Sequence, residues 1–155
     1  MSFSQSKITT VFVIRHAEKM SGNDPSLTET GKQRALQVDH LLKDAGITAI
    51  YSTQFKRTME TAEPLAKRLN LKIEPYNPRD NQSLVERVMN DHPGETILVV
   101  GHSNTVNKLS EAFGADDFGE LDESVYDYLY QLSIQFSNGK AIAKRVTLNT
   151  VNQKL

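Results

Sequence analysis

Short apolar runs alternate with amphipathic stretches along most of the chain. Residues 11–14 and 96–100 are apolar at nearly every position, which predicts short strands buried on both faces of a sheet. Residues 47–52 and 71–76 are predicted to form two further strands. The segments between and after these strands carry apolar residues at spacings of three and four, which predicts helices. The expected helices run from a cap at Thr28 to Gly46, over 54–69, over 83–90 and over 103–113.

The pattern changes in the last third of the chain. Apolar and polar residues alternate over 125–136, which is typical of a strand with two different faces. The sequence Ser137-Asn138-Gly139-Lys140 then predicts a two-residue hairpin turn before a last strand near 141–148. We therefore expect a three-layer α/β/α sandwich with a mostly parallel central sheet and a C-terminal antiparallel hairpin. With no linker, repeat or low-complexity segment, residues 1–155 are expected to form a single domain.

Composition narrows the classes of function. The chain has 155 residues, 18 basic and 19 acidic, so its net charge of −1 gives no general attraction to nucleic acid or acidic membranes. The absence of cysteine excludes disulfides, zinc–cysteine sites and a thiol nucleophile. The apolar run near the N-terminus is too short for a signal-peptide core, and no run approaches the roughly 20 residues that span a bilayer. A cytoplasmic location is expected.

Ionisable residues directly follow two of the predicted strands. Ligands in open α/β sheets collect beyond the carboxyl ends of the strands. Arg15 and His16 follow the first strand, and His102 follows the strand at 96–100 in the same relative position. We expect these side chains to meet at one edge of the sheet. The other two histidines lie within a helix and before a proline, and are expected to be ordinary solvated residues: His40 and His92.

A further arginine, Arg57, stands about one turn into the helix after the second strand and faces the same edge. Taken alone it would be a surface charge, but with Arg15 it predicts a site for a dianion, because guanidinium groups offer paired donors to phosphate oxygens. A neutral histidine is a good nucleophile toward phosphorus, and a protonated His102 could help the arginines to stabilise the transferring phosphoryl group. The chain has no Walker lysine loop and no obvious metal-binding motif, so neither a metal nor a cofactor is expected.

Four ordered motifs carry a resemblance to a known family. They are Arg15-His16-Ala17, Leu27-Thr28-Glu29-Thr30-Gly31, the segment from Thr53 to Arg57 with Thr61-Ala62, and Gly101-His102-Ser103. With them the sequence resembles the histidine phosphatase superfamily, also called phosphoglycerate mutase-like. The resemblance extends over residues 11 to about 113, roughly two thirds of the chain.

This resemblance implies a role for each motif. His16 would be the nucleophile that becomes phosphohistidine. Arg15, Arg57 and His102 would form the phosphate pocket, and Ser103 would line it. Water would then hydrolyse the intermediate, whereas in a mutase a second hydroxyl would accept the phosphate.

The sequence departs from the family pattern at two places. Ala17 replaces the usual glycine, which limits backbone freedom without changing a reacting group. The block that normally carries the proton donor is also missing. Asp80 is the favoured candidate because it lies in the loop after the third strand, where such donors are found. Glu18, close to the nucleophile, is a fallback that is otherwise expected to contact substrate, and Glu86 is the weakest candidate because it fits an ordinary helix pattern.

The missing acid bears on the substrate. An alkoxide leaving group needs protonation, which contributes about 10²–10⁴-fold to the rate, whereas a protonated imidazole leaves as a neutral ring. The chain also lacks insertions long enough for a lid. Both points favour protein phosphohistidine or activated small phosphates, and the chain resembles the short phosphohistidine phosphatases. A phosphoglycerate-type mutase and a non-catalytic phosphate-binding module remain alternatives, while a Rossmann domain is disfavoured because no glycine-rich loop follows the first strand.

Overall fold

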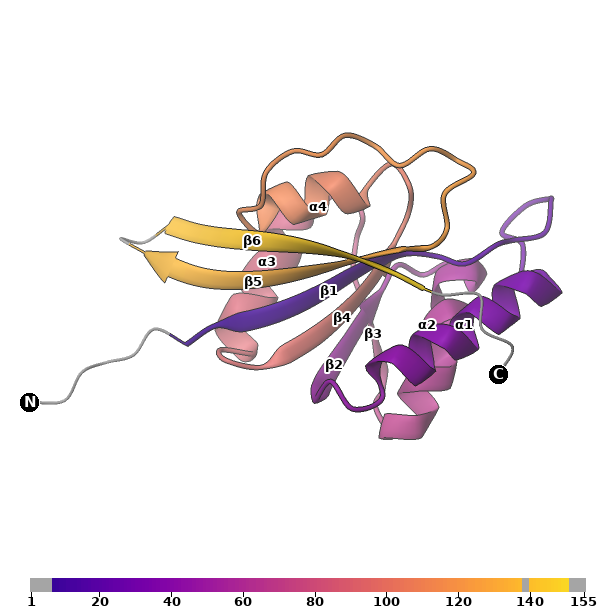
Figure 1. Cartoon of the computed structure of the whole chain (residues 1–155), viewed down its shortest axis with the longest axis horizontal. Coiled ribbons are helices and arrows are strands. Elements are labelled where there is room, and N and C mark those ends of the chain that lie inside the picture. Colours follow the sequence, from indigo (N-terminus) through magenta and orange to yellow (C-terminus); the bar gives the residue numbers. More distant parts are fainter. Residues whose placement is uncertain (1–6, 138–139, 151–155) are drawn as a thin grey trace, which may run out of the picture.

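The computed structural model describes residues 7–137 and 140–150, which form six strands and four helices (Figure 1). In chain order the elements are β1 (Thr9–Arg15), α1 (Glu29–Leu42), β2 (Ile47–Ser52), α2 (Lys56–Leu69), β3 (Ile73–Pro75), α3 (Asn81–Asp91), β4 (Thr96–Gly101), α4 (Val106–Ala112), β5 (Tyr128–Ser137) and β6 (Lys140–Asn149). No helix within these described ranges is long and apolar enough to cross a membrane.

All six strands belong to one sheet, in the order β3-β2-β4-β1-β5-β6. The first four are mutually parallel, β5 runs antiparallel to β1, and β6 runs antiparallel to β5. The expected mostly parallel sheet with a C-terminal antiparallel hairpin is therefore confirmed, although the predicted turn residues Asn138 and Gly139 lie outside the described residues. In the central pair, Arg15 of β1 is aligned with Gly101 of β4, so the two strands end at the same edge.

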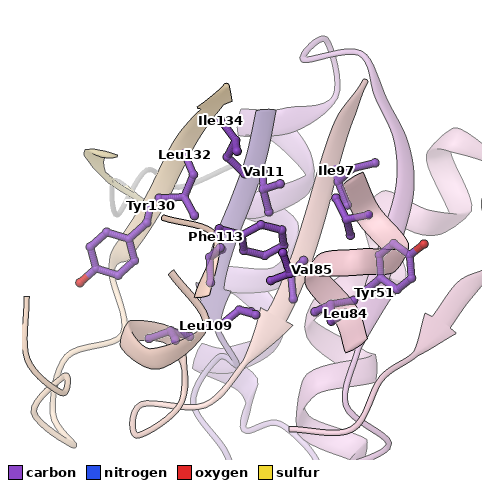
Figure 2. Packing of buried hydrophobic residues seen from close by; sticks show 14 of the residues in the cluster. Val11, Tyr51, Leu84, Val85, Ile97, Leu109, Phe113, Tyr130, Leu132 and Ile134 are labelled. Carbon is purple, nitrogen blue, oxygen red and sulfur yellow. The ribbon is translucent and has the colours of Figure 1, made fainter. Parts of the chain in front are cut away.

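Helices cover both faces of the sheet, which confirms the three-layer arrangement (Figure 1). On one face, α3 and α4 pack over Val11 and Ile97 through residues such as Leu84, Leu109 and Phe113 (Figure 2). On the other face, Val38 of α1 and Leu65 of α2 belong to a second buried cluster, together with Phe12, Ile14 and Leu98 of the strands. Because adjacent residues of β1 point into opposite clusters, the strand must be apolar throughout.

A local difference from the expected elements concerns α4. This helix begins at Val106, three residues later than the sequence pattern predicts. Residues 102–105 form a turn instead, in which Thr105 Oγ1 accepts a hydrogen bond from the backbone N–H of His102 at 3.1 Å. This turn keeps His102 at the sheet edge.

Candidate active site

Two histidines face each other where β1 and β4 end. The backbone N–H of His16 donates to the Gly101 carbonyl at 2.9 Å, which extends the strand pairing one residue beyond the sheet. The rings of His16 and His102 lie edge to face with centroids 5.5 Å apart, and both residues are buried. The structure thus brings together the two histidines that the sequence placed at equivalent strand ends.

The surroundings of His16 fix its tautomer. Its Nδ1 lies 2.7 Å from the Ala17 carbonyl oxygen, and because a carbonyl only accepts, Nδ1 carries the proton and Nε2 keeps a lone pair. The pKa of His16 is lowered to about 4, mainly by burial; the charges of Arg15 and Arg57 add to this, whereas the hydrogen bond to Ala17 opposes it. At neutral pH the ring is therefore uncharged and its Nε2 can act as a nucleophile.

His102 is oriented by a pair of threonines. The Thr58 hydroxyl donates to the Thr53 carbonyl, and the Thr53 hydroxyl donates to Thr58 Oγ1 at 2.9 Å. Thr53 Oγ1 is thereby left to accept a hydrogen bond from His102 Nε2 at 2.9 Å, which leaves Nδ1 unprotonated, 3.5 Å from an Arg57 nitrogen. The pKa of His102 is lowered to about 4, mainly by burial and then by the positive charges of Arg57 and Arg15. The protonated His102 expected from the sequence would therefore require a negative charge beside it.

Arg57 lies at the start of α2, beside His102. Its guanidinium stacks 4.6 Å from the Phe55 ring centroid, and the Phe55 ring in turn meets the His102 ring at 5.2 Å. Thr61 Oγ1 donates to the Arg57 carbonyl and accepts the backbone N–H of Ala17 at 2.9 Å, which ties α2 to the loop that follows His16. The Arg57 Nε is buried without a hydrogen-bond partner among the described residues.

Arg15 is almost completely buried, and most of its donors are already used. One terminal nitrogen donates to three backbone carbonyls, those of Asp122, Glu123 and Val125, at 2.8–3.3 Å. The guanidinium also stacks 3.8 Å from the ring centroid of Tyr126. As for Arg57, the Nε has no hydrogen-bond partner within the part of the chain that the structure describes. Arg15 thus holds the loop that returns from α4 against the pocket, a role that sequence reasoning missed.

The same loop brings a carboxylate to the site. Ser103, buried next to His102 as expected, donates from Oγ to Glu123 Oε1 at 2.8 Å. The other carboxylate oxygen of Glu123 lies 3.3 Å from Arg15. Neither Glu123 nor Tyr126 was identified from the sequence, because they belong to a loop rich in acidic residues that matches no motif and follows no strand end.

Glu18, a predicted substrate contact and fallback acid, is turned toward another partner. Both of its carboxylate oxygens accept hydrogen bonds from Arg34, at 2.6 and 3.1 Å. Burial alone would raise the pKa of Glu18, but the hydrogen bonds and charge of Arg34 lower it overall. The side chain is therefore an ionised member of an ion pair, and the contacts support a structural role for it.

The motif Leu27-Thr28-Glu29-Thr30-Gly31 shapes the loop that follows His16. Thr28 caps α1 by accepting the backbone N–H of Gly31 at 3.0 Å, and its own N–H donates to the Glu18 carbonyl. A side chain at position 31 would clash with that carbonyl oxygen. The glycine is thus required by the close approach of α1 to the loop that carries Glu18.

Asp80 caps α3. Its two carboxylate oxygens accept hydrogen bonds from the backbone and hydroxyl of Ser83, at 3.2 and 2.7 Å, and these bonds lower the pKa of Asp80. These hydrogen bonds hold the carboxylate at the first turn of α3. Glu86 lies on the exposed side of α3, 3.4 Å from the Gln82 amide nitrogen. These contacts favour structural roles for both candidates.

Replacing Asp80 separates its capping role from an acid role. Asp80→Ala should lower the melting temperature because the cap is lost, whereas Asp80→Asn, which can still cap, should lower it less. In both variants kcat should stay within about threefold of wild type, well short of the roughly 10²-fold effect of losing a general acid. Thermal unfolding and steady-state kinetics measure the two effects. A loss of about 100-fold in kcat for Asp80→Asn would restore Asp80 as the donor.

A cavity of about 760 Å³ lies next to the histidine pair. Phe55 lies between the cavity and the histidine pair, because its ring contacts the His102 ring and also lines the cavity. The other walls combine apolar groups such as Tyr76 and Pro78 with the cationic side chains of Arg79 and Arg87. A group attached to a phosphate between the histidines could therefore extend into this space.

The family model of the histidine phosphatase superfamily (branch 1) matches residues 11–77. This range contains the nucleophile candidate His16, Arg57, and the threonines that orient His102 and the loop at Ala17. The resemblance to the histidine phosphatase superfamily is confirmed over this stretch, which is less than half of the chain. His102, Ser103 and the loop around Glu123 lie beyond the matched range, and it is the fold that brings them to the same pocket.

A curated relative is similar to part of the chain. The probable phosphoglycerate mutase GpmB of Erwinia tasmaniensis is 36% identical over 64 residues, which cover 36% of this chain and 30% of the relative. The match thus spans less than a third of that protein's length, and the likeness does not extend to the whole enzyme.

Several solved structures of phosphatases share the fold over nearly the whole chain. A mycobacterial glucosyl-3-phosphoglycerate phosphatase superposes with a TM-score of 0.76 at 14% identity, covering 94% of this chain and all of its own. The protein histidine phosphatase SixA, solved with tungstate, gives 0.71 at 16% identity, covering 91% and 97%. A putative α-ribazole-5′-phosphate phosphatase from Escherichia coli gives 0.69 at 16% identity, covering 91% and 96%. At these identities the likeness establishes the fold.

Proposed function

We propose that the protein is a phosphatase that forms a phosphohistidine intermediate on His16. The observation that carries this proposal is the pairing of a neutral histidine, protonated at Nδ1, with two arginines whose Nε–H groups are buried. Nε2 of His16 keeps its lone pair, while the Nε–H groups of Arg15 and Arg57 are buried without partners among the described residues. Buried donors of this kind require an acceptor, and the oxygens of a phosphate group would supply it.

In the first half-reaction, His16 Nε2 forms a bond to phosphorus as the bond from phosphorus to the leaving oxygen breaks. Arg15 and Arg57 stabilise the negative charge on the equatorial oxygens, in the manner general for phosphoryl transfer. The dianion also favours protonation of His102 at Nδ1, the nitrogen that faces Arg57, so this ring becomes a further donor. The Ala17 carbonyl, which accepts from His16 Nδ1, stabilises the positive charge that develops on the attacking ring.

In the second half-reaction, water attacks phosphorus and His16 leaves as a neutral ring. The positive charges that held the substrate phosphate hold the intermediate in the same place, so no group needs to move far. The hydrogen bond from Ala17 N–H to Thr61 fixes the loop that carries the nucleophile throughout. None of these steps requires a metal ion.

Two substrate classes fit the site. The cavity beside Phe55, with Arg79 and Arg87 in its wall, suits a small phosphomonoester whose organic part carries a ring or a second negative charge. The second class is a phosphohistidine side chain of another protein. Its leaving group is a neutral imidazole, so the reaction depends less on a proton donor of the enzyme. Among the proteins of the same fold are a glucosyl-3-phosphoglycerate phosphatase and a protein histidine phosphatase, which makes both classes worth testing.

Chemical trapping tests the proposal. Wild-type protein incubated with a labelled phosphoryl donor and quenched in base should carry base-stable, acid-labile phosphate on the peptide that contains His16, with or without chelator. A panel of p-nitrophenyl phosphate, sugar phosphates and phosphohistidine protein should release free phosphate. Transfer to a second hydroxyl in place of release would indicate a mutase. Neither phosphoenzyme nor product from any donor would indicate a non-catalytic phosphate-binding module.

A further inference from the structure

The reaction needs a group that protonates the leaving oxygen. Glu18 and Asp80, the carboxylates favoured from the sequence, already have other partners, although Asp80 also lines the cavity beside Phe55. Glu18 is held in an ion pair by Arg34, and Asp80 caps α3. Among the described residues, Glu123 is the one carboxylate that a hydrogen bond or ion pair connects to the proposed phosphate pocket, through both Ser103 and Arg15. Its position therefore needs an explanation in terms of the reaction.

The backbone around Glu123 is held firmly although the side chain is exposed. Arg15 binds the carbonyls of Asp122, Glu123 and Val125, and the Leu121 N–H donates to the Ser103 carbonyl. The carboxylate itself has 83% of its side-chain surface exposed. A fixed backbone with an accessible carboxylate suits a group that must meet a substrate and also exchange protons with water.

A bound phosphate would lie beside this carboxylate. Glu123 and the phosphate would share the donors of Arg15 and Ser103, so the two groups would lie side by side. A proton carried by the carboxyl group would then be next to the phosphate whose leaving oxygen needs it.

We propose that Glu123 is the general acid and base of the reaction, an inference that rests on the phosphatase function proposed above. As the bond from His16 Nε2 to phosphorus forms and the bond from phosphorus to the leaving oxygen breaks, the Glu123 carboxyl gives its proton to that oxygen. Its carboxylate then takes a proton from the water that attacks phosphorus. Phosphate is released, and both the neutral His16 and the protonated Glu123 are regenerated.

The test compares good and poor leaving groups. Wild type and Glu123→Gln are assayed for kcat/KM on p-nitrophenyl phosphate, whose leaving group needs little protonation, and on an alkyl phosphate such as glycerol phosphate, whose leaving group needs a full proton. The ratio of the alkyl rate to the aryl rate should fall by about 10²-fold or more in Glu123→Gln. The matched control is Glu120→Gln, which removes an exposed carboxylate of the same loop and should leave the ratio unchanged.

Other outcomes would overturn the inference. An equal loss on both substrates would make Glu123 a residue that positions Arg15 and Ser103. An unchanged ratio together with about tenfold tighter inhibition by tungstate would show that Glu123 competes with the anion for their donors. Thermal unfolding of Glu123→Gln within a few degrees of wild type shows that the fold is intact. Because phosphoenzyme formation from p-nitrophenyl phosphate is measured separately in wild type, failure of the phosphatase proposal would be visible independently.

Discussion

His16→Asn should lower kcat/KM by about 10⁴-fold or more on every substrate that the protein hydrolyses, because loss of a covalent nucleophile removes the reaction path itself. Asparagine is close in size to histidine, and its amide can still donate to the Ala17 carbonyl, so the pocket should keep its shape. The trapped phosphoenzyme should also disappear. Steady-state kinetics and chemical trapping on the same protein preparation measure both effects.

The control for this variant is His40→Asn, which changes an exposed histidine on α1 and should retain wild-type turnover. Thermal unfolding of both variants separates loss of chemistry from loss of fold. If His16→Asn kept a tenth or more of the wild-type rate, His16 could not be the nucleophile.

Arg57→Gln should lower kcat by about 10²–10³-fold, the usual effect of removing one donor to a charged transition state. It should also raise the pKa of His102 and His16 from about 4 toward the ordinary value of 6.5. The sign follows from charge: Arg57 disfavours a second positive charge on either ring, so its removal makes protonation easier. Because burial remains the largest cause of the low pKa values, the rise should be partial. NMR titration of the histidine rings measures it.

Lys56→Gln is the matched control for Arg57→Gln. It removes the same charge one residue earlier in α2, where the side chain is exposed. We expect kcat and both histidine pKa values to stay near those of wild type. Unchanged pKa values in Arg57→Gln would show that its charge does not act on the rings, and the proposed electrostatic role would then be wrong.

The sequence is most informative where function depends on strand ends. The four parallel strands are recognisable from their apolar runs, and the rule that ligands gather at their carboxyl ends is enough to place His16, His102 and Arg15 at one edge. Arg57 follows because α2 starts from the same edge. Local patterns also predict the Thr28 cap and the start of α1.

The remaining parts of the site depend on contacts that no local pattern encodes. Arg15 donates to loop carbonyls that lie 107–110 residues later in the chain. Because every residue has a backbone carbonyl, the sequence does not show which carbonyls will accept these hydrogen bonds. Glu123 is one of several acids in that loop and looks like its neighbours in sequence. Asp80 shows the opposite ambiguity: its position after the third strand fits a catalytic acid, yet aspartate is equally favoured as a helix cap, which is the contact that the structure shows.

The carbonyls around Arg15 have a consequence for how the chain folds. Arg15 lies in the first strand, yet the acceptors of its charge come from the last third of the chain. During synthesis the N-terminal part emerges first, and β1 cannot bury its arginine favourably until the loop after α4 has been made, because a buried charge without partners is strongly destabilising. The N-terminal segment that carries Arg15 and His16 is therefore not an independent folding unit. The pocket can form only after the loop that leads from α4 to the last strands has been made.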